Sequence, residues 1–281
     1  MTTLWVNGRI VAPGESGVSA LDHGLTVGDG IFETALVDDG RPFALTRHLR
    51  RLERSAALVG MSTPTETEIR AAIEETLAAA AATSPVTHGR LRITVTSGVG
   101  PLGSDRGDAA PSLIVGVVPT GAWPAEVRAV TVPWTRNERS AVAGAKTTSY
   151  AENVVALAEA HRRDAHEALL ANTRGELCEG TGSNVVVVLD GELLTPPLSS
   201  GCLAGITREL FLEWAGQEGL AVVEKDLPFD VLAEAEGVLL TSSTRGVQPL
   251  AAIDGRPLER TEAGEKAREL YDRRAAEGID P

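Results

Sequence analysis

The chain has 281 residues, 43% of them hydrophobic, which suffices for two domains of ordinary size or one large one. No stretch approaches the ~20 apolar residues of a membrane-spanning helix, and the first residues lack the pattern of a secretory signal. The formal net charge of −13 disfavours a nucleic-acid surface. Cys178 and Cys202 stand without a CxxC motif or a histidine cluster, which indicates a reduced, cytoplasmic setting and no metal site.

The first 118 residues predict a small domain of mixed strands and helices. Two apolar runs on either side of Asn7-Gly8 are typical of a β-hairpin, and a glycine-rich turn around Gly28 precedes a predicted strand over residues 30–37. Helical spacing of apolar residues predicts a helix over residues 45–59, and Thr65 with Glu68 signals the start of a second helix over residues 66–82. Further strands are predicted over residues 90–96 and 112–118.

Proline and glycine gather in residues 119–124, which we interpret as the linker to a second domain over residues 125–281. Strands are expected there over residues 127–132, 168–171, 185–189, 192–195, 221–225 and 237–240, and helices over residues 152–167, 208–218, 229–234 and 262–276. No repeat of fixed period is found. Strands and helices mix without strict alternation, so the predicted fold class is α+β.

Two charged residues of the second domain form a chemically meaningful pair. Lys146 precedes a predicted helix, and Glu179 lies on the next predicted hairpin. The lysine amine can form an imine with an aldehyde, and the carboxylate can hold a protonated ring nitrogen. These are the two protein groups that a pyridoxal phosphate site needs. The alternative for both residues is a solvated surface position.

Such a site also needs a cradle for the phosphate, and three segments offer one. Gly205-Ile206-Thr207 lies at a predicted helix start, with unpaired N–H groups and a hydroxyl. Ser242-Ser243-Thr244 follows a predicted strand, and Arg51 on the first helix offers a charged ligand. Taken alone, these segments are also explained by a capped helix, a polar turn and an exposed arginine, and Arg50 or Arg54 is the alternative inward arginine.

Six motifs in one order along nearly the whole chain resemble those of the class IV, or fold-type IV, pyridoxal-phosphate enzymes. They are Gly28–Glu33, His48–Leu52, Lys146, Glu179–Asn184, Leu203–Arg208 and Thr241–Thr244. The family includes D-amino-acid transaminases, branched-chain aminotransferases and aminodeoxychorismate lyases. The resemblance implies a smaller N-terminal α/β sandwich and a larger C-terminal pseudo-barrel with the cofactor between them. It also implies a homodimer in which the neighbour's loop near residues 100–108 completes each pocket.

The resemblance also implies roles for single residues. Lys146 is then the catalytic lysine that forms an imine with pyridoxal 5′-phosphate, and Glu179 pairs with the pyridine nitrogen. Tyr150 resembles the tyrosine that hydrogen-bonds the cofactor's ring oxygen, and Leu203 resembles the residue that packs on the ring. The implied cofactor-binding residues around the phosphate are Arg51, Gly205, Ile206, Thr207, Ser242, Ser243 and Thr244.

The particular reaction is predicted from positions where members of the family differ. Standard D-amino-acid transaminases have a tyrosine where this chain has Phe32, and an Arg-x-His pair in the region of residues 100–106. We therefore expect Phe32 to line the substrate pocket and Arg106 or Arg136 to bind the substrate carboxylate.

We predict a transaminase that exchanges an amino group between a small D-amino acid, or a related primary amine, and a 2-oxo acid. The alternative is a 4-amino-4-deoxychorismate lyase that releases pyruvate and 4-aminobenzoate, because the string Gly28–Thr34 resembles that of such lyases. A branched-chain L-amino-acid aminotransferase and a non-catalytic pyridoxal-phosphate-binding protein are further alternatives.

Overall fold

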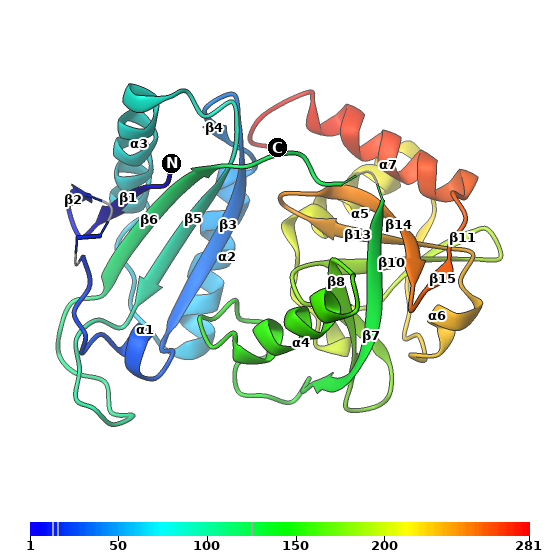
Figure 1. Cartoon of the computed structure of the whole chain (residues 1–281), viewed down its shortest axis with the longest axis horizontal. Coiled ribbons are helices and arrows are strands. Elements are labelled where there is room, and N and C mark those ends of the chain that lie inside the picture. Colours follow the sequence, from blue (N-terminus) through cyan, green and yellow to red (C-terminus); the bar gives the residue numbers. More distant parts are fainter. Residues whose placement is uncertain (13, 16, 125) are drawn as a thin grey trace. The chain divides into compact units, whose positions relative to one another are not determined.

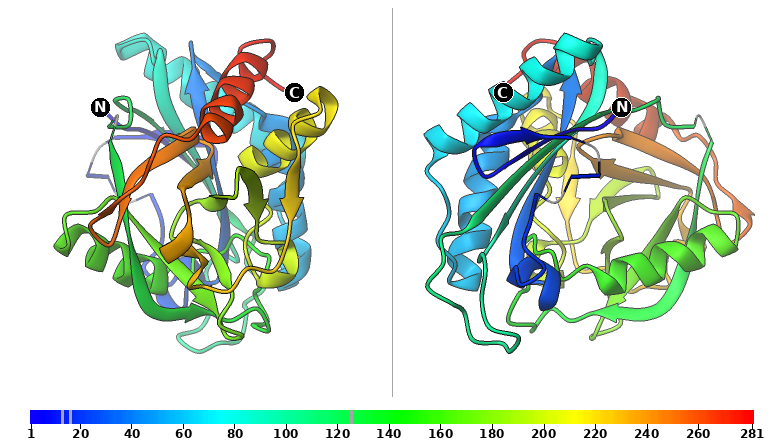
Figure 2. Two further views of the ribbon diagram at one scale, coloured as in Figure 1. Left: turned by 90° about the vertical axis from the view of Figure 1, so that its right-hand side faces the viewer. Right: turned by 60° about the vertical axis from the view of Figure 1, so that its left-hand side comes forward.

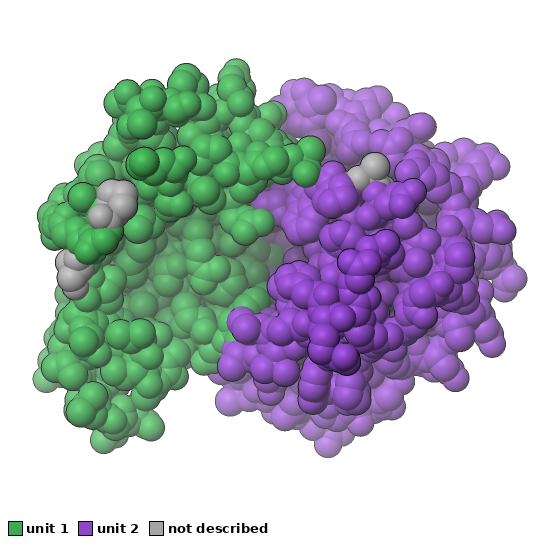
Figure 3. Space-filling model, in the orientation of Figure 1, with its two compact units in different colours: residues 1–122, 145–150, 279–281 green, residues 123–144, 151–278 purple. Residues whose placement is uncertain are grey.

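The computed structural model describes residues 1–12, 14–15, 17–124 and 126–281, and the chain divides into two compact units (Figure 3). Unit 1 comprises residues 1–122, 145–150 and 279–281, and unit 2 comprises residues 123–144 and 151–278. The main division falls inside the predicted linker, residues 119–124. Two segments that the sequence placed in the second domain, residues 145–150 and 279–281, belong to unit 1. Ala125, the first residue of that predicted domain, lies outside the described residues.

Unit 1 is built on a six-stranded antiparallel sheet in the order β2-β1-β6-β5-β3-β4. Its strands are β1 (Thr3–Val6), β2 (Arg9–Val11), β3 (Gly30–Asp38), β4 (Arg41–Pro42), β5 (His88–Thr96) and β6 (Ser112–Pro119). Its helices are α1 (His23–Thr26), α2 (Leu45–Val59) and α3 (Glu66–Thr83) (Figure 1). The predicted hairpin, strands and helices of this region are confirmed, with bounds that shift by at most two residues.

Alternation along the strands decides which side chains enter the core of unit 1. Odd-numbered residues of β3 and β5, such as Ile31 and Leu91, are fully buried in a cluster with the apolar residues of α2 and α3. The right-hand view of Figure 2 shows both helices on one face of the sheet. Even-numbered residues, such as Phe32 and Arg92, therefore belong to the opposite face.

Helix α2 has two buried faces of different chemistry. One face is apolar and joins the core of unit 1. The other is a polar stripe of His48, Arg51 and Ser55, which lie along one line of the helix because they are three and four residues apart. The helix lacks a side-chain cap of its own, and Asp280 supplies one: its carboxylate accepts from the Thr46 N–H at 2.9 Å and from the Thr46 hydroxyl at 2.6 Å.

Unit 2 is built on a nine-stranded mixed sheet in the order β12-β11-β10-β13-β14-β7-β8-β9, with β15 paired to β14. The last strand in this order, β9, also contacts β10, so the sheet curls on itself. The strands are β7 (Val127–Arg136), β8 (Glu167–Asn172), β9 (Leu177–Gly180), β10 (Asn184–Leu189), β11 (Glu192–Thr195), β12 (Val222–Glu224), β13 (Gly237–Ser242), β14 (Gly246–Ile253) and β15 (Arg256–Pro257). The helices are α4 (Ala151–Arg162), the 3₁₀ turn η1 (Leu198–Ser200), α5 (Ile206–Glu218), α6 (Val231–Glu234) and α7 (Glu262–Ala275).

Several elements of unit 2 differ from the sequence prediction: β7 extends to Arg136 instead of ending at residue 132, and the short strands β9 and β15 were not predicted. Helix α4 ends at Arg162 rather than at residue 167, because Asp164 adopts a left-handed φ of 56° and closes the helix before β8 begins. Strand β14 was not predicted, since Pro249 in its middle lacks the N–H that a strand normally donates.

Both units combine helices and sheets, which confirms the α+β class. Within the described part of the chain, none of the helices has the length and apolar content that crossing a bilayer requires.

We expect Asp280→Ala to lower the free energy of unfolding by about 1 kcal/mol, the usual loss when a helix-capping side chain is truncated. Urea unfolding followed by circular dichroism measures this change. Glu269→Ala is the control, because Glu269 is an exposed carboxylate on α7. An equal effect of both substitutions would contradict the capping role.

Candidate active site

Lys146 lies in unit 1, in a segment that runs beside the first residues of β3. Its carbonyl accepts a hydrogen bond from the Phe32 N–H at 2.9 Å, and its N–H donates to the Ser55 hydroxyl at 3.1 Å. The next anchor is the Thr148 N–H, which donates to the Gly30 carbonyl at 2.8 Å. The main chain of Lys146 is therefore fixed by β3 and by the polar stripe of α2.

Two glycines before and within β3 permit this close approach. Gly28 has a φ of 71°, which favours glycine, and a Cβ there would lie 2.9 Å from the Ser149 hydroxyl. A Cβ on Gly30 would lie 2.9 Å from the Thr148 hydroxyl. Both hydroxyls donate to the Gly28 carbonyl. The packing of the lysine segment thus explains the glycines of the first motif.

The Lys146 amine lies beside two aromatic rings. Its Nζ is 4.3 Å from the centre of the Phe32 ring and 5.7 Å from that of Tyr150, and the two rings meet edge to face at 5.2 Å. The guanidinium carbon of Arg92 is 3.7 Å from the centre of the same Phe32 ring. In unit 1 the Phe32 ring therefore lies beside the Lys146 amine, the Tyr150 ring and the Arg92 guanidinium. Phe32 and Tyr150 were predicted as site residues, whereas Arg92 was not.

Arg92 lies on the face of the sheet opposite α2 and α3. Its Nε donates to the Thr94 hydroxyl at 3.2 Å, and it forms no ion pair with a carboxylate of the described residues. Partial burial lowers the pKa of Arg92; the charge of Tyr150 opposes this shift and that of Arg90 adds to it. The sequence signal for Arg92 was the alternation of side chains along β5, which has a period of two. Together with the pairing of Thr94 with Phe32, this alternation places the Arg92 side chain on the same face of the sheet as Phe32.

Arg51, a predicted phosphate ligand, lies in a buried cluster on the helix side of the sheet. The Glu33 carboxylate accepts from Nε and Nη2 of Arg51 and from Nδ1 of His48, each at 2.7 Å. Burial alone would raise the pKa of Glu33, but the charge of Arg51 and the hydrogen bonds from Arg51 and His48 outweigh it and hold the pKa at about 2. One edge of the guanidinium is thus fixed by Glu33, and phosphate binding by Arg51 stays a prediction.

Arg106, a predicted substrate ligand, joins three parts of unit 1. Its Nε and Nη2 donate to the Asp29 carboxylate at 2.7 Å each, and it also donates to the carbonyls of Val59 and Gly60 at the end of α2. The hydrogen bonds from Arg106 lower the pKa of Asp29. A substrate carboxylate would compete with Asp29 for this guanidinium, and the predicted substrate role is not tested by these contacts.

In unit 2, two donors hold the Glu179 carboxylate at the end of β9. Arg136 Nε donates to Oε1 at 2.9 Å, and the Leu203 N–H donates to Oε2 at 2.9 Å. Arg136 Nη1 also donates to the Asn153 side chain at 2.8 Å. The structure therefore places Arg136 against Glu179. The role predicted for Arg136, binding of the substrate carboxylate, stays a prediction.

The buried side chain of Glu167, which is only 1% exposed, anchors the hairpin loop after β9. Its carboxylate accepts from the N–H and hydroxyl of Thr181 and from the Ser183 hydroxyl. At the end of the loop, Asn184 Nδ2 donates to the Leu203 carbonyl at 2.8 Å. The loop and its neighbours thus fix both main-chain polar groups of Leu203, the residue predicted to pack on the cofactor ring.

Helix α5 begins at Ile206, with Gly205 as its N-cap and no side-chain cap among the described residues. A Cβ on Gly205 would lie 2.0 Å from the Asn184 Oδ1, so any other residue there would displace the Asn184 side chain. The first N–H groups of the helix carry the positive end of its dipole, which suits an anion. Thr207 is buried and lies close to Tyr271 of α7, and its proximity lowers the pKa of that tyrosine.

The turn that carries Ser242, Ser243 and Thr244 joins β13 to β14. The Tyr271 ring packs against this turn at Gly246, where an added Cβ would approach it to 3.2 Å. Burial raises the pKa of Tyr271 to about 12. Tyr271 thus links the turn to the start of α5. This tyrosine was not predicted as a site residue, because it lies on a helix of mostly charged residues.

Comparisons with known proteins identify the family of this chain. Residues 30–253 match the family model of amino-transferase class IV. A putative branched-chain-amino-acid aminotransferase of Methanocaldococcus jannaschii is 33% identical, and the match covers 96% of this chain and 94% of the relative. A bifunctional aminodeoxychorismate lyase/D-amino acid transaminase of Mycobacterium tuberculosis is also 33% identical, and the match covers 95% of this chain and 96% of the relative. A D-alanine aminotransferase of Listeria innocua is 31% identical, and the match covers 89% of this chain and 87% of the relative.

Solved structures show the same likeness. A branched-chain aminotransferase of Thermoproteus uzoniensis with norvaline superimposes with a TM-score of 0.87 at 30% identity, covering 97% of this chain and 94% of that one. The pyridoxal-phosphate-bound form of a hypothetical Mycobacterium tuberculosis aminotransferase gives a TM-score of 0.84 at 31% identity, covering 97% and 98%. The chain therefore belongs to amino-transferase class IV, which confirms the resemblance seen in the sequence and the fold-type IV architecture.

The cofactor of this family is pyridoxal 5′-phosphate, and the residues present fit it. The chain offers a primary amine at Lys146 on an anchored main chain, an acceptor carboxylate at Glu179, and a helix start after Gly205 that no side chain of the described residues caps. No group of three or more histidine, cysteine or acidic side chains among the described residues could hold a metal ion.

We expect Glu33→Gln to lower the free energy of unfolding at pH 7 by about 3–5 kcal/mol, because it leaves Arg51 buried without a counter-charge. The pKa of Glu33 falls from 4.5 to about 2 on folding, so this stabilisation is present above pH 4.5 and is lost as the pH falls towards 2. Urea unfolding of both proteins across this range measures it.

Glu53→Gln is the matched control, since Glu53 is exposed on the same helix. A difference between wild type and Glu33→Gln that stays constant from pH 7 to about pH 2 would show that the charge of Glu33 does not matter.

Proposed function

We propose that this class IV aminotransferase transfers an amino group between a small D-amino acid, or a related primary amine, and a 2-oxo acid. The relatives named as D-alanine aminotransferase and as D-amino acid transaminase support the choice of a D-amino acid. The second candidate is the 4-amino-4-deoxychorismate lyase reaction, which the bifunctional Mycobacterium tuberculosis relative favours. A branched-chain L-amino-acid reaction is the third, favoured by the Methanocaldococcus jannaschii relative.

We assign the cofactor's contacts as the sequence predicted them. Lys146 is assigned to the aldehyde carbon of the cofactor and Glu179 to its ring nitrogen. Tyr150 is assigned to the ring oxygen, and Leu203 is assigned to one face of the ring. The residues assigned to the phosphate are Arg51, Gly205, Ile206, Thr207, Ser242, Ser243 and Thr244. When bound, pyridoxal phosphate supplies the carbonyl that exchanges the amino group and a ring that accepts electrons from the substrate.

Lys146 is assigned as the group that moves the proton at its Nζ. A general base must lie within reach of the proton that it takes. The two hydrogen bonds at Lys146 hold its main chain, so the amine moves only by rotation of the side-chain bonds. The faces of Phe32 and Tyr150 stabilise the amine when it carries a proton. The site can therefore hold a proton at Nζ and release it to a neighbouring atom.

Glu179 is assigned as the partner of the cofactor's ring nitrogen. Arg136 Nε and the Leu203 N–H both donate to its carboxylate, which keeps this group an acceptor for a protonated nitrogen. The contact with Arg136 also balances the negative charge of Glu179, so the arginine limits how strongly the carboxylate attracts that proton.

The observation that carries the proposal is the arrangement of Lys146 and Arg92 about the Phe32 ring. Amino acids and 2-oxo acids share a carboxylate next to the reacting carbon, and a cation near the reactive amine is what would hold it. Arg92 is such a cation, and its distance from Nζ cannot exceed the sum of their distances to the ring centre. We therefore propose that Arg92, rather than the predicted Arg106 or Arg136, binds the substrate carboxylate, and that Phe32 lines the pocket.

The proposal also includes a cytoplasmic homodimer. Cys178 and Cys202 are both free and buried, and burial raises the pKa of each thiol, which agrees with a reduced setting.

We expect D-alanine and D-glutamate to convert the yellow, pyridoxal-phosphate-loaded protein to the pyridoxamine form, seen as loss of its visible absorbance. L-leucine is expected to react at least about tenfold slower, a difference of about 1.4 kcal/mol in transition-state binding. Release of pyruvate from aminodeoxychorismate without any reaction of D-amino acids would favour the lyase, and a faster reaction of L-leucine would favour the branched-chain enzyme.

A further inference from the structure

Two connecting segments of unit 2 leave its sheet at the same edge. Strands β10 and β13 are antiparallel, and Asn184, the first residue of β10, pairs with Thr241 near the end of β13. The hairpin loop before β10 and the turn after β13 are therefore neighbours. Arg245 closes this turn, where its N–H donates to the Ser242 carbonyl at 3.1 Å.

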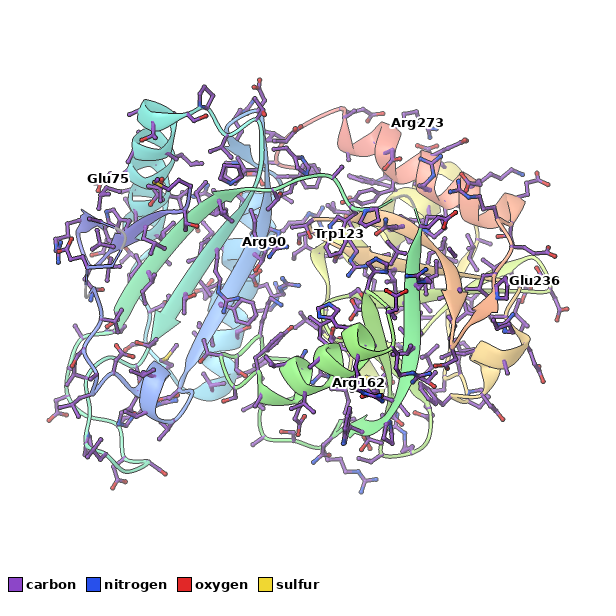
Figure 4. All side chains as sticks on the ribbon, in the orientation of Figure 1. Glu75, Arg90, Trp123, Arg162, Glu236 and Arg273 are labelled. Carbon is purple, nitrogen blue, oxygen red and sulfur yellow. The ribbon has the colours of Figure 1, made fainter. Side chains whose placement is uncertain are left out.

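The guanidinium of Arg245 contacts an acid and an aromatic ring. Its Nη2 lies 3.4 Å from Oε2 of Glu167, and its central carbon lies 3.7 Å from the centre of the Trp123 ring, which Figure 4 labels. The side chains of Arg245 and Glu167 are only 5% and 2% exposed. Because charge interactions are stronger away from water, these contacts hold the guanidinium in place.

Glu167 extends this contact to the hairpin loop. The same carboxylate accepts from the Thr181 N–H at 2.9 Å, from the Thr181 hydroxyl, and from the Ser183 hydroxyl at 2.9 Å. Glu167 is the first residue of β8 and belongs to neither connecting segment. One buried carboxylate thus joins the turn, through Arg245, to the hairpin loop, through Thr181 and Ser183.

Trp123 orients the guanidinium from the other side of the chain's connections. An arginine can pack flat on an aromatic face, whereas the ammonium group of a lysine is a compact point charge. The segment that carries the ring is anchored as well, because the carbonyl of the next residue, Pro124, accepts from Nε2 of Gln248 at 2.9 Å. The end of the predicted linker therefore helps to hold the turn after β13.

The cofactor makes the spacing of these two segments important. In the proposed function, the turn residues Ser242, Ser243 and Thr244 take part in phosphate binding, and Glu179, just before the hairpin loop, holds the ring nitrogen. Covalent bonds join the ring nitrogen to the phosphate in pyridoxal phosphate, so their separation varies little. A ligand that spans two sites gains affinity from both only when the geometry lets it occupy them together.

We propose that Arg245 is a positioning residue for cofactor binding, which acts through Glu167 and holds the phosphate turn in register with the hairpin loop that follows Glu179. The inference rests on the proposed function, which assigns these two segments to the two ends of the cofactor. Loss of Arg245 should therefore weaken a ligand that spans both segments more than a ligand that occupies one of them.

Binding of three probes to the full-length chain, freed of cofactor, tests this proposal by calorimetry. Pyridoxal 5′-phosphate spans both segments, whereas pyridoxal and inorganic phosphate each occupy one. We expect Arg245→Met to weaken binding of pyridoxal phosphate by about 10- to 100-fold and to leave binding of the other two probes within about twofold of the wild type.

Arg128→Met is the matched control, because Arg128 is an exposed arginine of the same unit that also pairs with an acid, Asp164. It should bind all three probes as the wild type does. Unchanged binding of pyridoxal phosphate in Arg245→Met, or an equal loss for inorganic phosphate, would overturn the inference. The measurement does not involve amino transfer, so failure of D-amino acids to react would refute the proposed function and leave the binding result standing.

A double variant tests the path through Glu167. For pyridoxal phosphate, Glu167→Gln/Arg245→Met should bind about as weakly as Glu167→Gln alone, because the second substitution removes a contact that the first has already broken. Losses that multiply in full would contradict this path.

Arg245→Lys decides the question if Arg245→Met does not fold. It keeps the charge but loses the flat contact with the Trp123 ring, so we expect about a three- to tenfold loss for pyridoxal phosphate, with the other two probes unchanged. Equal losses for all three probes would show that Arg245 has only a structural role.

Discussion

The two hydrogen bonds at the main chain of Lys146 set the position of the amine on which the chemistry depends. One comes from the Phe32 N–H of β3, and the other goes to the Ser55 hydroxyl of α2. Because a strand and a helix of the same unit hold this peptide, the amine keeps only the freedom of its own side chain. The glycines before and within β3 and the polar stripe of α2 are both explained by the requirement that the lysine segment pack closely against them.

Buried charge appears in both units, and in both it fixes a predicted cofactor-binding segment. In unit 1, Glu33 accepts three hydrogen bonds from Arg51 and His48, and in unit 2, Glu167 holds the hairpin loop through Thr181 and Ser183. A buried ion pair contributes little net stability compared with an apolar replacement of the same shape, since each charge loses its hydration. The benefit of such clusters is orientation: they fix the direction of a guanidinium and the path of a loop.

The sequence predicted the local elements well because each follows from a period or a cap. The helix over residues 45–59 came from apolar spacing alone, and that over residues 66–82 came from the capping pair Thr65 and Glu68, which the structure shows in full. The order of the six motifs was enough to identify the family, which the comparisons confirm. Their residue-by-residue roles remain proposals that the geometry supports.

What the sequence could not provide are the contacts between residues far apart in the chain. Arg92 resembled any polar strand residue until the register of β3 and β5 placed it near Phe32. Tyr271 lies on a helix of mostly charged residues, and its contact with Thr207 joins positions separated by most of unit 2. Arg136 gained its partner Glu179 only through the neighbouring strands β7, β8 and β9. Such pairings depend on tertiary packing, which local patterns do not determine.

The central claim is that Lys146 carries the cofactor. Reduction of the yellow holoenzyme with borohydride fixes the pyridoxyl group to the lysine that holds it, and peptide mapping by mass spectrometry locates that lysine. The label is expected on Lys146 in the wild type and is expected to be lost in Lys146→Ala, with Lys266→Ala as a control that retains it. Pyridoxyl label on Lys225 or Lys266, or retention of the label in Lys146→Ala, would contradict the account.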